Sequence, residues 1–74
     1  MDMELEAGAL YRHCKGGSYK IVGVARHSET LEEMVIYAES ESPKNLWARP
    51  KGMFLDYVER DGVKVRRFEP ISKK

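Results

Sequence analysis

The residues with the clearest capacity for chemistry in this sequence are cationic, histidine and aromatic side chains that occur in three short stretches. An arginine beside aromatic rings can hold a carboxylate or a phosphate while a ring stacks on a base or packs against a proline. We therefore predict a ligand-binding surface built from these stretches. Its residues are Tyr11, Arg12, His13, Arg26, His27, Glu29, Thr30, Trp47 and Arg49.

Strand geometry groups part of this surface. Side chains two positions apart on a strand share a face, so Trp47 is predicted to lie with Arg49, and Tyr11 with His13. A structural role remains open for the tryptophan, because the one Trp of so short a chain can simply fill the core.

Structural roles are also open for the cations. Arg26 and Arg49 can pair with Glu29 or Glu33 across a hairpin. A second basic cluster falls on the last predicted hairpin, where we favour a role in discouraging pairing between molecules. This cluster comprises Arg60, Lys64, Arg66 and Arg67.

The sequence gives little support for a catalytic nucleophile or a metal-binding site. His13 and Cys14 are adjacent, so on a strand they point to opposite faces and cannot form a nucleophile–base pair. No CxxC, HxH or HExxH spacing fixes two metal ligands on one face. We therefore predict no catalytic residue, no metal site and no cofactor, and we favour a binding protein over an enzyme.

Short strands dominate the predicted secondary structure, because β-branched and aromatic residues recur with a period of two. The predicted strands span residues 8–14, 19–27, 34–39, 46–49, 57–59 and 63–68. Gly16-Gly17 and Asp61-Gly62 predict tight turns, since glycine readily adopts positive φ. Residues 28–33 are predicted as a hairpin loop, with a short capped helix as the alternative, and residues 40–45 as a turn.

The chain is predicted to be all-β, as a small SH3-like barrel of five or six short strands, closed or nearly closed. A 3₁₀ turn at residues 51–55 would plug the barrel before the last hairpin, with Met53 and Phe54 in the core. An OB-type barrel is the alternative, weakened because no helix is visible between the third and fourth strands. We predict a disordered tail at residues 1–7, one domain at 8–70 and a loose end at 71–74.

Composition limits the function classes. The net charge of +1 argues against a dedicated nucleic-acid binder, although acidic and basic residues cluster separately and folding can still gather a basic face. A single cysteine excludes an internal disulfide, so a reducing cytoplasm is the expected location. No apolar run approaches the ~20 residues of a membrane span, and the acidic N-terminus lacks the order of a signal peptide.

Several sequence words resemble one small bacterial family, the domain of unknown function numbered sixteen fifty-three. The words are Tyr11-Arg12-His13 with Lys15-Gly16, the stretch from Gly23 to Thr30, and Leu46-Trp47-Ala48-Arg49-Pro50 with Met53-Phe54. The resemblance implies a stand-alone cytoplasmic domain with an SH3-like fold, and it implies no established activity, substrate or cofactor. The polar stretch 39–45 departs from the family, whose members carry a tyrosine- and glycine-containing loop there.

These observations predict a binding module whose ligand is gripped between strand 11–13, loop 26–30 and strand 47–50. A protein or peptide partner and nucleic acid are nearly equal hypotheses. A small-molecule or nucleotide-binding domain, with or without enzymatic activity, is the alternative. Homodimerisation is open as well, because small barrels leave sheet edges.

Overall fold

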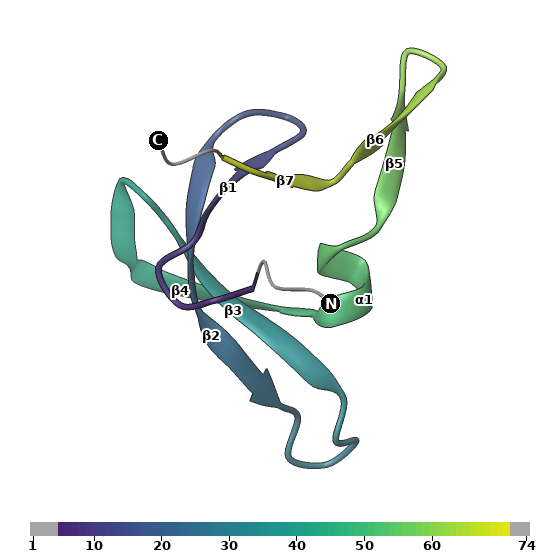
Figure 1. Cartoon of the computed structure of the whole chain (residues 1–74). Coiled ribbons are helices and arrows are strands. Elements are labelled where there is room, and N and C mark those ends of the chain that lie inside the picture. Colours follow the sequence, from purple (N-terminus) through teal and green to yellow (C-terminus); the bar gives the residue numbers. More distant parts are fainter. Residues whose placement is uncertain (1–4, 72–74) are drawn as a thin grey trace.

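The computed structural model describes residues 5–71, which form a five-stranded antiparallel sheet and a separate two-stranded hairpin (Figure 1). The elements are β1 (Leu10–His13), β2 (Ser18–Arg26), β3 (Glu33–Glu39), β4 (Ser42–Pro50), α1 (Lys51–Phe54), β5 (Tyr57–Arg60), β6 (Val63–Arg66) and β7 (Phe68–Pro70). No helix within residues 5–71 is long and apolar enough to cross a membrane.

The large sheet has the strand order β4-β3-β2-β1-β7, and β5 pairs with β6. The prediction of an all-β fold is therefore confirmed. The sheet does not close into a barrel, because β4 and β7 are its two edges among the described strands. Figure 1 shows the β5–β6 hairpin projecting away from the sheet, beyond α1.

The two predicted glycine-containing turns are confirmed, and a hairpin loop joins β2 and β3 one residue earlier than the predicted 28–33. Gly16 and Gly17 have φ values of 108° and 88°, which favour glycine. Asp61 and Gly62 both have positive φ, at 55° and 79°, as the tight β5–β6 turn requires. Arg26 of β2 pairs with Glu33 of β3, so residues 27–32 form a hairpin loop.

Strand β4 is longer than predicted. It begins at Ser42, where it pairs with Glu39, so the prediction of a turn through residue 45 is wrong. The proline in this stretch, Pro43, is tolerated because β4 is an edge strand and a missing N–H can face away from the sheet.

The helical turn after β4 also differs from the prediction. Leu55 N–H donates to the Lys51 carbonyl at 3.1 Å, so the turn is α-helical rather than 3₁₀. Phe54 is fully buried, whereas Met53 is 48% exposed, and the prediction of Met53 in the core is wrong.

The structure divides the last predicted strand, residues 63–68, into the two strands β6 and β7. β6 ends at Arg66 and β7 begins at Phe68, because the chain leaves the hairpin at Arg67 and crosses to pair with β1. Pro70 pairs with Tyr11, and Ile71 N–H donates to the Leu10 carbonyl at 2.9 Å. The β1–β7 pairing therefore extends to Ile71, the first residue of the C-terminal segment that was predicted to be loose.

Most of the two predicted loose ends lies outside the described residues, namely at 1–4 and 72–74. Within the predicted N-terminal tail, Leu5 packs against the core. The N–H of Gly8, the residue that follows the predicted tail, donates to the Ile21 carbonyl at 2.8 Å. Leu5 and Gly8 thus tie the start of the described chain to the core and to β2.

The core lies on one face of the sheet, which we call the inner face. Its buried members are Tyr11, Ile21, Val35, Tyr37, Phe54 and Phe68. Phe54 of α1 stacks on Phe68 of β7 with centroids 4.1 Å apart, and it meets Tyr11 and Tyr37 edge-on at 5.3 Å. Aromatic packing thus joins the helical turn to both halves of the sheet.

Candidate functional site

Cross-strand register places three predicted ligand-binding residues on the inner face. Trp47 pairs with Tyr37, and His13 pairs with Phe68, both partners being core residues. Arg49 shares the face of Trp47 two positions further along β4. His13, Trp47 and Arg49 thus surround the part of the inner face that the core does not fill.

Two hollows open at this place. The first, which we call the aromatic hollow, has a volume of about 320 Å³ and is lined by His13, Tyr19, Tyr37, Glu39, Trp47, Arg49 and Phe68. The second, the cationic hollow, has a volume of about 670 Å³ and is lined by His13, Cys14, Lys15, Arg49, Val58, Glu59, Arg60, Asp61 and Arg67. His13 and Arg49 line both, so the two hollows meet at this pair.

Arg49 is held by neutral groups. Its Nε donates a hydrogen bond to the Tyr37 hydroxyl at 3.4 Å, and its Cζ lies 5.7 Å from the centroid of the Phe68 ring. The predicted pairing with Glu33 does not occur, because Glu33 binds Lys51 at 3.2 Å. Within residues 5–71, Arg49 forms no ion pair. Its charge is therefore positioned but not neutralised.

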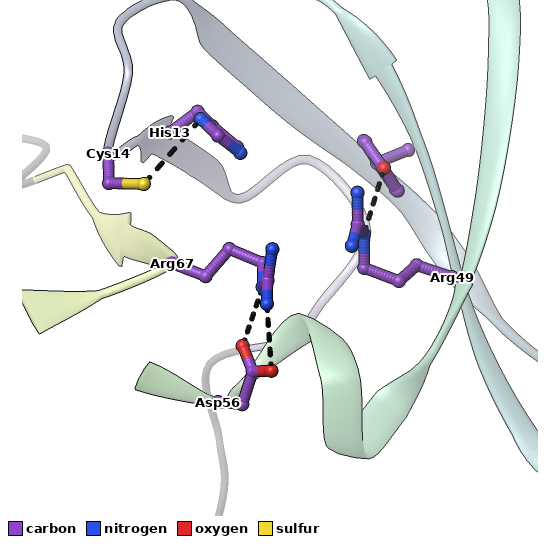
Figure 2. Close-up of polar contacts among 6 residues, drawn as sticks. His13, Cys14, Arg49, Asp56 and Arg67 are labelled. Carbon is purple, nitrogen blue, oxygen red and sulfur yellow. Dashed lines mark hydrogen bonds and ion pairs between the residues drawn. The ribbon is translucent and has the colours of Figure 1, made fainter. Parts of the chain in front are cut away.

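Arg67 has a carboxylate partner. Its Nε and Nη2 donate to the two carboxylate oxygens of Asp56 at 2.7 and 3.1 Å. These hydrogen bonds hold the pKa of Asp56 below its ordinary value and raise the pKa of Arg67. Figure 2 shows the guanidinium groups of Arg67 and Arg49 and the ring of His13 directed toward one space.

His13 is the uncharged member of this group. Its Nδ1 accepts a hydrogen bond from the Lys15 N–H at 3.0 Å, so in the neutral ring the proton is assigned to Nε2. Burial, followed by the charges of Arg49, Arg67, Lys15 and Arg60, lowers the pKa of His13 below 6.5. All four of these charges are cations, so the potential at the ring is positive.

The lowered pKa of His13 predicts a pH dependence of folding. The unfolded chain takes up this proton first as the pH falls below about 6.5, so the free energy of unfolding decreases from there until the pH passes below the folded-state pKa. Urea denaturation from about pH 8 to about pH 5 should show this loss, reduced in the His13→Asn variant. Arg49→Gln should raise the pKa of His13 in an NMR titration, and a wild-type value at or above 6.5 would contradict the expectation.

Cys14 contacts His13, which corrects the prediction that the two side chains point apart. The Cys14 Sγ lies 3.9 Å from the His13 Nδ1, because β1 ends at His13 and the strand alternation does not extend into the turn. This Nδ1 already accepts the Lys15 N–H at 3.0 Å. The ring nitrogen nearest the thiol is therefore engaged, and the contact is long for a nucleophile–base pair.

Comparison with known proteins identifies the family. The family model "Protein of unknown function (DUF1653)" matches residues 9–70. The chain belongs to this family. The crystal structure of a DUF1653 protein from Bordetella bronchiseptica is similar to it, with a TM-score of 0.76, 27% identity, and coverage of 93% of this chain and 91% of that one. No functionally curated protein matches.

The remaining predicted residues of this DUF1653 chain lie elsewhere. Tyr11 is fully buried in the core, and the exposed Arg12 lies on the opposite face of β1, across from Glu69 of β7. Figure 1 shows the β2–β3 loop at the far end of these two strands. Neither hollow is lined by the residues predicted there, namely Arg26, His27, Glu29 and Thr30.

The polar residues of that loop have structural contacts. His27 Nδ1 accepts hydrogen bonds from the backbone N–H groups of Glu29 and Thr30 at 3.1 and 3.3 Å. Thr30 Oγ1 accepts the Glu32 N–H at 3.2 Å, and Arg26 donates to the Leu31 carbonyl at 3.4 Å. These bonds shape a loop in which Leu31 has a φ of 66°. The structure does not bring this loop to His13 and Arg49.

Sequence reasoning missed several residues of the hollows in this DUF1653 domain. Tyr19, Tyr37 and Phe68 supply aromatic walls, and Lys15 and Arg67 supply cations. Strand alternation could have placed Tyr37 on one face with Val35 and Glu39, and this was the one available signal for Tyr37. Pairing with Trp47 and the crossing of β7 to β1 required the register, which the sequence does not contain.

Metal ligation has no geometric basis in the part of the chain that the structure describes. Within residues 5–71, no three histidine, cysteine, aspartate or glutamate side chains gather closely enough to hold an ion. The two hollows of the DUF1653 domain present cations, an imidazole and aromatic rings.

Proposed function

We propose that this domain is a non-enzymatic binding module that recognises an anionic group of its ligand at Arg49. The observation that carries the proposal is that the Arg49 guanidinium is held in place but has no carboxylate partner among the described residues. Its guanidinium is fixed by Tyr37 and Phe68, forms no ion pair within residues 5–71, and stands where two hollows meet. A planar guanidinium held in this way is already oriented to bind a carboxylate or phosphate.

Charge distribution supports a short anionic ligand over a long duplex. Glu59 and Asp61 interrupt the cations of the cationic hollow, and the net charge of the chain is +1. A protein that follows a duplex backbone needs a continuous basic track. A peptide or a short single strand needs only one or two anion contacts beside an aromatic surface.

The proposal extends to fold family and location. We assign the sheet to the SH3-like barrels in an open form, with one domain at about residues 8–70. A helical turn that carries an aromatic residue, Phe54, follows β4, and after the β5–β6 hairpin the last strand, β7, returns to pair with β1. The free thiol of Cys14 supports a cytoplasmic location.

An amide NMR titration tests the binding proposal. Isotope-labelled protein is titrated with a short single-stranded DNA, a short RNA and a glutamate-rich peptide, each at low and high salt. We expect shifts at His13, Trp47 and Arg49 with at least one probe, and weaker binding at high salt. Shifts confined to the loop at residues 26–31, or a silent spectrum with all three probes, would refute the site at Arg49.

A further inference from the structure

The two hollows differ in chemistry although they share His13 and Arg49. The aromatic hollow contains the rings of Tyr19, Tyr37, Trp47 and Phe68, and its one carboxylate is Glu39. The cationic hollow contains Lys15, Arg60 and Arg67 in addition to Arg49, opposed by Glu59 and Asp61. A ligand that occupies both needs a flat apolar part and an anionic part.

Trp47 supplies an unused stacking surface in the aromatic hollow. Tyr19, Tyr37 and Phe68 contact one another edge-on, with centroids 5.4–5.6 Å apart. Trp47 contacts no other aromatic ring of the described residues and is 50% exposed. An indole face left open beside a hollow is the kind of surface on which a nucleobase stacks.

The anionic part of the ligand belongs at Arg49 and beyond it. Glu39 disfavours a second negative charge in the aromatic hollow, whereas the cations around His13 attract one. Trp47 and Arg49 lie two positions apart on one strand face, roughly 7 Å along β4. This spacing is comparable to the separation between the base and the 5′-phosphate of a nucleotide.

We propose that the ligand is a nucleotide unit, with its base on Trp47 in the aromatic hollow and its phosphate on Arg49 at the entrance to the cationic hollow. This inference rests on the proposed function and specifies its ligand class. Both hollows fall within the about 300–1,000 Å³ that small-molecule sites occupy. An acidic peptide would use Arg49 but would leave the open face of Trp47 without a flat partner.

The same chemistry can come from a free nucleotide or from a nucleic-acid strand, and the test separates these sources. Amide NMR titrations compare adenosine 5′-monophosphate with its two halves, adenosine and ribose 5-phosphate. We expect the nucleotide to bind about tenfold or more tightly than either half. A single-stranded hexanucleotide with and without a 5′-phosphate then shows whether internal phosphates, strand ends or only free nucleotides are bound.

A matched pair of variants isolates the base. Trp47→Ala should weaken nucleotide binding about fivefold or more, because one stacking surface is lost. Leu46→Ala is the control, since Leu46 is the neighbouring residue, is 58% exposed and points to the other face of β4. Binding of ribose 5-phosphate should be the same in both variants.

Failure of the inference is distinguishable from failure of the proposed function. If ribose 5-phosphate and the nucleotide bind equally tightly at Arg49, the base does not contribute to binding, and Arg49 is an anion site only. Shifts at Arg49 with the glutamate-rich peptide but not with any nucleotide probe would overturn the nucleotide and retain the binding module. No shift at Arg49 with any probe would overturn both.

Discussion

Replacing Phe54 with alanine is expected to lower the free energy of unfolding by about 3–5 kcal/mol. Phe54 is fully buried, stacks on Phe68 at 4.1 Å and meets Tyr11 and Tyr37 edge-on. Its removal leaves a cavity between α1 and the sheet. A chain of 74 residues has a total stability of about 4–11 kcal/mol, so the variant should lie close to the unfolding threshold in urea denaturation.

The control for this prediction is the adjacent residue. Met53→Ala should change the free energy of unfolding by less than about 1 kcal/mol, because Met53 is 48% exposed. Phe54→Leu keeps most of the buried volume and should retain a dispersed amide spectrum, which provides a measurable intermediate if the alanine variant is unfolded. Equal losses for Met53→Ala and Phe54→Ala would contradict the packing described for α1.

Replacing Arg49 with glutamine is expected to weaken binding of the best NMR probe by about tenfold or more. The variant removes a guanidinium that is fixed by Tyr37 and Phe68 and has no ion-pair partner among residues 5–71. For a single-stranded nucleic acid, the magnitude of the slope of log affinity against log salt should fall by about 0.7, the contribution of one phosphate contact. Titration of wild type and variant at several salt concentrations measures both quantities.

Two further substitutions make this test specific. Arg49→Lys keeps the charge but loses the planar fork, so it should restore only part of the affinity. Arg26→Gln removes a cation from the far end of β2, where its side chain donates to the Leu31 carbonyl, and should leave affinity unchanged. Arg49→Gln removes one hydrogen bond to Tyr37 and one contact with the Phe68 ring, so it should lower stability by about 1 kcal/mol. Equal affinity losses for Arg26→Gln and Arg49→Gln would indicate diffuse charge attraction instead of a site.

Local signals were sufficient to predict most of the strands. The alternation of β2 and β3, the glycines at 16 and 17 and the Asp61-Gly62 turn are properties of short segments, and the structure confirms them. Local signals could not predict that the last strand is divided into β6 and β7. Arg67 leaves the hairpin where Asp56 binds it, and β7 then pairs with β1, an interaction between residues far apart in the chain.

The candidate site was predictable to a similar extent. The shared face of Trp47 and Arg49 follows from strand alternation within one segment. The neighbours that define the hollows, such as Tyr37 and Phe68, come from register and from the pairing of the chain ends. The second predicted stretch, residues 26–30, carries similar residue types, but its distance from His13 is set by the length of the β2–β3 ladder.

The separation of the β5–β6 hairpin from the large sheet has an evolutionary consequence. The hairpin forms its own ladder and is anchored at its base, where Arg67 N–H donates to the Asp56 carbonyl and Cys14 N–H donates to the Arg67 carbonyl. Insertions, deletions and charge changes at its tip therefore leave the strands that hold Arg49 in place. Arg60 and Asp61 at that tip line the cationic hollow, so its charge can change through substitutions that leave the large sheet intact.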